Sequence, residues 1–366
     1  RSAGMSKRPT IQPWIRNAVT ETVFILLPPF FSVLIVVLFP AVFQQSGGIT
    51  DTWWILLILL VDVAHVYSTL YRTYFDPAAY KEHKNKLLLI PFASFVALVL
   101  LYTQSVHWFW RIMAYTAAYH FVRQQYGFMR IYSRKEAANK YYRVIDAITI
   151  YAATIYPLLY WHLHSDRNFN WFVEGDFFNL SGIHYLSQVC TILYVLILCA
   201  YLVKECTWVY QSRRFNIPRN VVILGTILSW YLGIVYFNGD LAFTLLNVVS
   251  HGIPYMALIW LYGKRTTAQP ETNSGRIMKL AFSKYGILVF LGLIFLLAFI
   301  EEGLWDMTLW KEHANIFRMF DMGKVHLDPD IMKIIVPLLA LPQVTHYIID
   351  GFIWRIRKND LKWSEK

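Results

Sequence analysis

The stretch from Leu87 to Gln104 reads LLLIPFASFVALVLLYTQ and contains no charged residue. As a helix rising about 1.5 Å per residue, it would cross most of a hydrocarbon core about 30 Å thick. Similar blocks recur along the 366-residue chain, which is 57% hydrophobic and only 16% charged. Soluble domains carry about 25% charged residues. The composition therefore excludes a water-soluble fold and predicts an all-α, polytopic integral membrane protein.

The apolar blocks predict about ten transmembrane helices, close to residues 20–43, 52–72, 87–104, 107–130, 142–163, 183–204, 220–237, 241–262, 281–300 and 331–355. Residues 1–4 precede Met5 and are expected to be a cloning remnant, so we interpret residues 5–366 as a single transmembrane helical domain. The predicted outer loop 301–330 is amphipathic in places, and it is either an interfacial lid or an ordinary loop.

The positive charges alternate between the predicted loops. Twenty-seven Lys and Arg residues fall on one side of the predicted membrane and four in the loops of the other side. Because cytoplasmic loops retain Lys and Arg, this distribution predicts cytoplasmic N and C termini, and in a bacterium a location in the plasma (inner) membrane. Most of the net charge of +11 therefore reflects the orientation of the chain in the membrane. No basic arm or zinc-finger spacing indicates a nucleic-acid partner.

Four histidines, His65, His120, His251 and His346, lie inside predicted spans. All four spans are predicted to run from outside to inside, and each histidine lies about 15–22 Å from the start of its span. An ionisable side chain in hydrocarbon is costly unless it is paired or bound. Neutral imidazole is a common metal ligand, so four imidazoles in one layer predict a metal centre.

Each predicted ligand helix also carries other polar residues near its histidine. Asp62 precedes His65 by three residues, Asn247 precedes His251 by four, and Asp350 follows His346 by four, so each pair shares a helix face. A metal-bound imidazole usually donates its second N–H to such a group. Asp62 and Asp350 are predicted as further metal ligands or as orienting groups, and Asn247 as an orienting group.

Arg123, Gln124 and Tyr255 are the remaining polar residues near the predicted layer. We expect them to act as catalytic groups that meet a polar part of the substrate or oxygen. Arg123 is also expected to pair with Asp62 or Asp350, which would bring the layer close to neutrality before a metal binds.

Imidazole with an optional carboxylate suits iron, zinc or copper. Copper(I) would favour Cys and Met, and a zinc hydrolase would usually show a His-Glu-x-x-His spacing, so both fit less well. Buried among apolar walls, the set fits a non-haem Fe(II) oxygenase. Its partners would be the bilayer, O₂ and a long lipophilic substrate that is cleaved or hydroxylated; whether an electron donor takes part stays open.

The sequence motifs around the four histidines resemble those of a known protein family. Asp62-Val63-Ala64-His65, Tyr119-His120-Phe121, Val249-Ser250-His251 and Thr345-His346-Tyr347-Ile348-Ile349-Asp350 resemble the spaced histidine motifs of the Brp/Blh family of membrane β-carotene cleavage oxygenases. That resemblance implies a polytopic iron enzyme with these four histidines as ligands, a carotenoid-like substrate and retinal as product. It covers the four motifs of the chain.

Two other classes remain open from the sequence. In a proton-coupled transporter the same His/Asp layer would relay protons near the midplane, although paired broken helices in the two halves are not evident. In a structural or assembly protein the layer would only hold helices together. Metal content separates the enzyme from both.

Overall fold

The computed structural model describes residues 12–44, 48–136, 139–167, 170–269, 274–320 and 327–354. Over these ranges the chain forms helices and no strand, which confirms the all-α prediction. The predicted cloning remnant, residues 1–4, and the positive charges from Arg355 onward lie outside the described residues.

The helices follow one another with short connections. In chain order they are α1 (Ala18–Glu21), η1 (Thr22–Leu26), α2 (Pro28–Leu38), α3 (Pro40–Phe43), α4 (Asp51–Trp54), η2 (Ile55–Val63), α5 (Ala64–Ser68), η3 (Thr69–Arg72), α6 (Pro77–Gln104), α7 (Val106–Ser133), α8 (Lys140–Leu163), α9 (His184–Ser212), α10 (Ile217–Trp230), η4 (Tyr231–Tyr236), α11 (Asp240–Phe243), η5 (Thr244–Val248), α12 (Val249–Ala268), α13 (Arg276–Ala281), α14 (Ile287–Trp305), η6 (Asp306–Trp310), η7 (Arg318–Phe320) and α15 (Pro329–Ile353).

Within the described ranges, eight helical segments are long and apolar enough to cross a membrane, or nine if the pair Ala18–Leu26 and Pro28–Leu38, bent by 46°, forms one span. Helix α7 coincides with the remaining predicted span but is not among them. Its 28 residues include Arg111, Arg123 and Arg130, which lower its mean hydropathy. The structure thus supports a multi-pass arrangement by length and composition.

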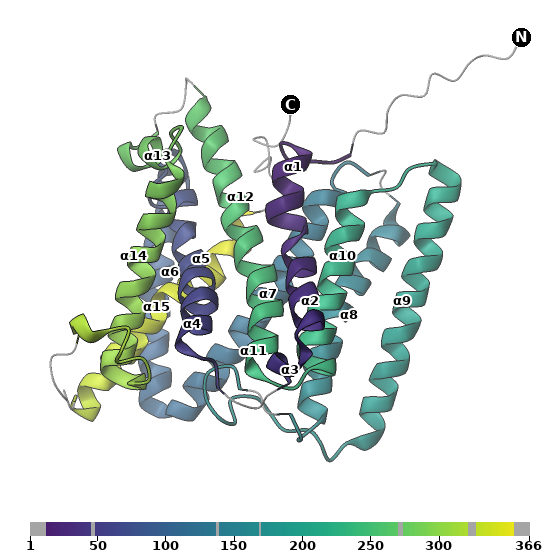
Figure 1. Ribbon diagram of the computed structural model, residues 1–366. Coiled ribbons are helices and arrows are strands. Elements are labelled where there is room, and N and C mark those ends of the chain that lie inside the picture. The colour runs from purple at the N-terminus through teal and green to yellow at the C-terminus, as the bar shows by residue number, and fades with distance from the viewer. Residues whose placement is uncertain are drawn as a thin grey trace, which may run out of the picture.

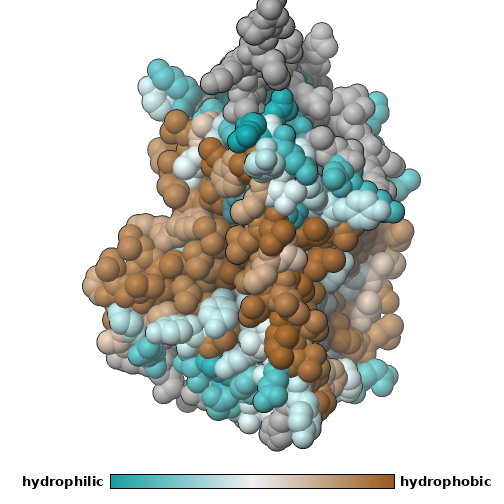
Figure 2. Space-filling view, turned by 90° about the vertical axis from the view of Figure 1, so that its right-hand side faces the viewer, coloured by the Kyte–Doolittle hydropathy of each residue, from teal (hydrophilic) through white to brown (hydrophobic). Residues whose placement is uncertain are grey.

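The molecular surface has the pattern expected of such a protein. Figure 2 shows a broad hydrophobic belt across the middle of one face, with hydrophilic residues gathered above and below it. Large apolar side chains of α2, α6 and α9 are exposed, among them Phe31, Phe92 and Leu202. Exposed apolar residues in a continuous belt indicate a lipid-facing surface.

Helix α12 lies at the centre of the bundle. In the apolar window of its segment, Asp240–Ala268, 83% of residues are buried, against 11% for Tyr185–Ser212 and 17% for Pro77–Gln104. Figure 1 shows α12 and α7 in the middle of the bundle and α9 at its edge. The helix that carries His251 is therefore the most buried of these apolar segments.

The ninth predicted span differs from the structure at both ends. Residues 281–300 were expected to be continuous, but α13 ends at Ala281 and α14 begins at Ile287. At the other end, α14 continues to Trp305 and η6 to Trp310, so the predicted outer loop 301–330 begins with helix. Trp305 and Trp310 pack near Trp110, with ring centroids 6.0 and 5.3 Å away, and this packing favours the longer helix.

Two π-helical segments directly precede ligand-bearing helices. Segment η2, Ile55–Val63, leads into α5 with His65, and η5, Thr244–Val248, leads into α12 with His251. π-Helical turns are uncommon and often occur at functional sites. Asp62 and Asn247 lie inside these two segments.

Candidate metal centre

The four predicted histidines converge on one point. His65, His120, His251 and His346 each offer one ring nitrogen, and these four nitrogens lie within 4.8 Å of one another. All four side chains are buried, and they come from α5, α7, α12 and α15. Residues separated by up to 281 positions in sequence thus form one cluster, which we call the histidine cluster.

Close backbone packing brings two of the helices together. A Cβ atom added to Gly252 would lie 2.7 Å from Val61 Cγ1 and 2.9 Å from the Val61 carbonyl oxygen. Only glycine therefore allows α12 to approach η2 this closely. The approach places His251 Nε2 3.1 Å from His65 Nε2.

The outer nitrogens of two rings have partners that leave the inner nitrogens available. His65 Nδ1 lies 3.3 Å from the Val61 carbonyl oxygen, to which it can only donate. This assigns the proton to Nδ1 and leaves a lone pair on His65 Nε2. His346 Nδ1 lies 2.7 Å from Thr69 Oγ1, while His346 Nε2 has no partner among the described residues.

Other buried ring nitrogens in the described part of the chain also lack partners. His120 Nε2 and His251 Nδ1 make no hydrogen bond there. An unsatisfied buried polar atom costs about 1–3 kcal/mol. Several such atoms in one cluster could donate their lone pairs to a metal ion.

Both predicted carboxylates border the cluster without hydrogen-bonding to a histidine. Asp62 Oδ1 lies 3.8 Å from His65 Nδ1. Asp350 Oδ2 lies 3.9 Å from His120 Nε2, and its Oδ1 lies 4.0 Å from His346 Nδ1. The structure thus places Asp62 beside His65, and Asp350 beside both His120 and His346.

Thr69 is part of the site and was missed in the sequence reasoning. Its hydroxyl contacts His346 Nδ1 and lies 2.9 Å from the Tyr255 hydroxyl, which donates to Asp350. A polar chain therefore connects His346 to Asp350 through Thr69 and Tyr255. Its position four residues after His65, on the same helix face, is the sequence signal that would have found it.

The other predicted residues take different partners. Arg123 donates to the Tyr151 hydroxyl and stacks over the Tyr126 ring at 4.9 Å, so the expected pairs with Asp62 or Asp350 do not form. Gln124 Nε2 donates to the His251 carbonyl oxygen at 2.8 Å. Asn247 donates to the Phe243 carbonyl oxygen, and its Oδ1 has no partner in the described residues.

Aromatic rings fix the orientation of two imidazoles. Phe121 stacks on His251 with ring centroids 3.7 Å apart and an interplanar angle of 5°. Tyr347 stacks on His120 with centroids 4.8 Å apart. Locked ring planes keep ligand nitrogens directed at one point.

One cavity beside the cluster is lined by residues of η2, α11 and η6. Helix α11 lies at the lower end of the molecule in Figure 1. This acidic cavity has a volume of about 380 Å³ and reaches Asp62. No Lys or Arg lines it among the described residues, whereas five carboxylates do: Asp62, Asp240, Glu302, Asp306 and Glu312.

A second cavity is lined by residues of α7, α12 and α15 and by Arg143 near the start of α8. This arginine pocket has a volume of about 520 Å³ and reaches His120, Tyr255 and Asp350. Arg123, Arg130 and Arg143 also line it. The two cavities thus have opposite charge and meet different sides of the histidine cluster.

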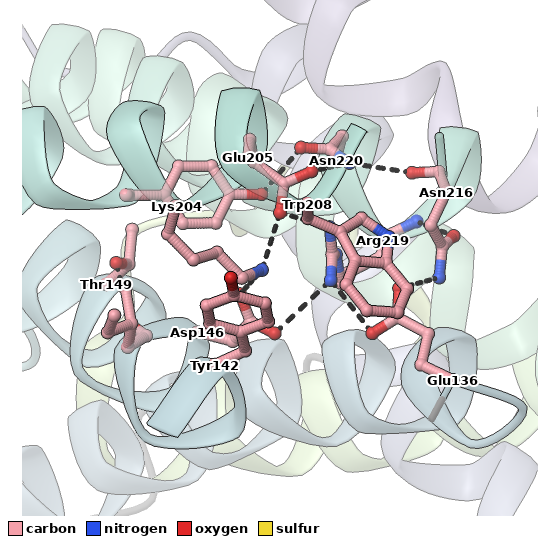
Figure 3. A network of polar contacts seen from close by, with 12 residues as sticks. Glu136, Tyr142, Asp146, Thr149, Lys204, Glu205, Trp208, Asn216, Arg219 and Asn220 are labelled. Atoms are coloured by element: carbon pink, nitrogen blue, oxygen red, sulfur yellow. Dashed lines mark hydrogen bonds and ion pairs between the residues drawn. The ribbon is translucent and has the colours of Figure 1, made fainter. Parts of the chain in front are cut away.

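A separate polar network joins α8, α9 and α10, as Figure 3 shows. Lys204 Nζ lies 2.5 Å from both Asp146 Oδ1 and Glu205 Oε1. Arg219 contacts Glu205, Glu136 Oε2 at 2.8 Å and Asp146 Oδ2 at 3.3 Å. We call these five residues the ion network. Asp146 thus pairs with both Lys204 and Arg219.

Fold and site define a helical protein with a multi-pass pattern of apolar segments and a buried cluster of four histidines. Comparison of the chain with protein-family models, with curated proteins and with solved structures gives no match. The function is therefore argued from this chain's own residues.

Proposed function

We propose that this protein is a membrane-embedded, non-haem iron oxygenase that acts with O₂ on a lipophilic substrate. In this proposal all ten predicted spans cross the membrane and both termini are cytoplasmic. The convergence of four buried ring nitrogens within 4.8 Å carries the proposal. The resemblance of the four motifs to the Brp/Blh family is consistent with it.

The donor set fits a transition-metal ion. Two ligand nitrogens at about 2.1 Å from one ion can be separated by at most about 4.2 Å, close to the observed limit of 4.8 Å. Bound metal would satisfy the partnerless nitrogens His120 Nε2 and His346 Nε2. An all-histidine set with nearby carboxylates and no Cys or Met suits iron, and zinc less well.

Ferrous iron, when bound, would supply the redox chemistry by which O₂ reacts with an organic substrate. The protein residues would set up that chemistry. Thr69 holds the His346 ring through Nδ1, and Tyr255 holds the Asp350 carboxylate. Tyr255 and Asp350 also line the arginine pocket, where Tyr255 can present its hydroxyl to a substrate.

Metal analysis of the purified full-length protein tests this function. We expect about one iron per chain, and a large loss of iron in His120→Ala. His164→Ala is the matched control, because His164 lies at the lower end of α8 and bonds to the Tyr160 carbonyl oxygen. Absence of any stoichiometric transition metal, or full metal content in His120→Ala, would overturn the proposal.

Substrate turnover is tested next by coexpression with a carotenoid pathway and measurement of colour loss. Loss of colour that requires His120 would support cleavage of a carotenoid-like substrate. If the colour is retained although the protein binds iron, the proposal becomes an oxygenase that acts on another long apolar substrate.

A proton-coupled transporter is the second candidate, and the two cavities favour it. The acidic cavity reaches Asp62 and the arginine pocket reaches Asp350, so the histidine layer is approached from both ends of the molecule. Access from two sides of a midplane site is typical of transporters. Proton-linked flux into proteoliposomes by metal-free protein would favour transport over the oxygenase.

A further inference from the structure

The arginine pocket changes character along its length. At its deep end lie His120 and Asp350, the only carboxylate among its described lining residues. Ten residues further along α7, at about 1.5 Å per residue, Arg130 lies about 15 Å away along the helix axis. Between them the wall is largely apolar or aromatic, formed by Tyr126, Phe128 and Leu258.

Two of the three arginines have no protein partner in the described ranges. The guanidinium groups of Arg130 and Arg143 make no ion pair or hydrogen bond with a described residue. Arg219, by contrast, contacts three carboxylates. A guanidinium that lines a cavity and has no carboxylate partner is available to bind an anion, and its planar fork matches carboxylate and phosphate oxygens.

The pocket is also open at the side of the molecule. Tyr119, next to His120, lines it and is 65% exposed, and Arg123 one turn further is exposed as well. Both residues belong to α7, within one of the ten predicted spans. A ligand can therefore enter from the bilayer without first crossing the aqueous end.

From these features we propose that the arginine pocket binds a long-chain amphiphile with an anionic end group, a carboxylate or a phosphate. Arg130 and Arg143 hold the anionic end, and the apolar chain extends about 15 Å toward the histidine cluster. This inference rests on the proposed function and narrows its substrate class. A neutral carotenoid would leave both guanidinium groups without an anion.

Equilibrium binding to the full-length protein in nanodiscs of neutral lipid tests the inference. The probes are radiolabelled palmitate, hexadecyl phosphate and hexadecanol, which share a chain length and differ in the end group. We expect at least one anionic probe to bind about tenfold more tightly than hexadecanol, because a hydrogen bond to a charged group contributes that much. The anionic probe that binds more tightly shows whether the preferred end group is a carboxylate or a phosphate.

Arg130→Gln and Arg143→Gln should each weaken binding of the preferred anion about tenfold and leave hexadecanol binding unchanged. Arg276→Gln is the matched control, because Arg276 is an exposed arginine at the same end of the molecule and does not line the pocket. Equal binding of all three probes would overturn the inference, and so would an equal loss of binding in Arg276→Gln.

Iron content is measured on the same preparations and separates the two proposals. Selective anion binding by protein without stoichiometric metal supports the pocket assignment and overturns the metal-dependent function. Full iron content with no preference for an anionic probe overturns the pocket assignment and leaves the oxygenase standing.

Discussion

The histidine cluster and the ion network are both buried among apolar helices, yet their polar atoms are satisfied to different degrees. Each of the five charged side chains of the ion network lies within 3.3 Å of an opposite charge. In the histidine cluster, His120 Nε2, His251 Nδ1 and His346 Nε2 have no hydrogen-bond partner within the described residues.

This difference separates polar groups that are paired within the protein from groups that have lone pairs available for a ligand. Paired charges offset one another's desolvation, so the ion network fastens α8, α9 and α10. Among its buried side-chain atoms only Arg219 Nε lacks a hydrogen-bond partner within the described residues. Partnerless nitrogens would cost free energy unless something else binds them. Burial of polar residues alone would not have distinguished the two regions; their hydrogen-bond partners do.

The largest expected effect comes from breaking the ion network. Arg219→Leu leaves three carboxylates with Lys204 as their only described cation, and removal of one member of a buried pair costs about 3–5 kcal/mol. We expect a clearly lower thermal midpoint in detergent, with unchanged iron content per folded chain. Arg219→Lys retains the positive charge and should lower the thermal midpoint less than Arg219→Leu does. An unchanged midpoint in Arg219→Leu would mean that the network contributes little to stability.

Removal of one cluster histidine should instead affect metal affinity more than stability. His346→Ala removes one of four ligands, and we expect metal affinity to fall by about 100-fold or more, beyond the 10- to 100-fold usual for groups that only orient a ligand. The metal-free protein should lose less stability than Arg219→Leu does, because removal of the partnerless Nε2 offsets part of the cost of the cavity and of the lost Thr69 contact. Chelator competition and thermal unfolding measure the two effects. Unchanged affinity in His346→Ala would exclude this residue as a ligand.

A smaller effect is expected from Thr69, which contacts the cluster through His346. Thr69→Val keeps the side-chain volume but removes the hydroxyl at 2.7 Å from His346 Nδ1. We expect a 10-fold weaker metal affinity, in the range of about 10- to 100-fold seen for such orienting groups. Thr69→Ser should restore the affinity. If Thr69→Ser binds metal as weakly as Thr69→Val, the methyl group and not the hydroxyl matters.

The smallest expected effect is a pH dependence within the ion network. Burial raises the pKa of Glu136 above its ordinary value of 4.5, although Arg219 opposes the shift. The folded chain therefore binds the proton of the Glu136 carboxyl group more tightly than the unfolded chain does. The stabilisation that this proton gives the folded state is complete below pH 4.5 and is lost as pH rises through the raised pKa. Glu136→Gln should flatten the thermal midpoint over the pH range directly above 4.5. An unchanged profile would contradict the assignment.

Apolar blocks and intramembrane histidines were readable from the sequence because both depend on composition and helical spacing. Helix ends were less readable. The break between Ala281 and Ile287 and the extension to Trp310 depend on tertiary packing, here the contacts of Trp305 and Trp310 with Trp110. Local hydropathy does not record such contacts.

In the candidate site, too, some features could be predicted from the sequence and others depend on tertiary packing. The histidine convergence followed from equal depth on four helices. The spacing of Thr69 from His65 marks it as a candidate, but its contact with His346 depends on how η3 faces α15. Arg123 was expected to meet a carboxylate by charge alone, but its α7 position directs it to Tyr151. Partner choice depends on which face each helix turns to its neighbours, and a single sequence leaves that open.

The π-helical segments η2 and η5 make the metal centre sensitive to the length of the chain. A π-turn contains about one residue more than an α-turn, so deletion of one residue from Ile55–Val63 would allow a regular α-helix to form. Each residue turns a helix by about 100°, and the deletion would rotate Trp54 and the acidic cavity wall relative to His65. Single-residue insertions and deletions in these two segments would therefore re-aim the ligands without replacing any of them.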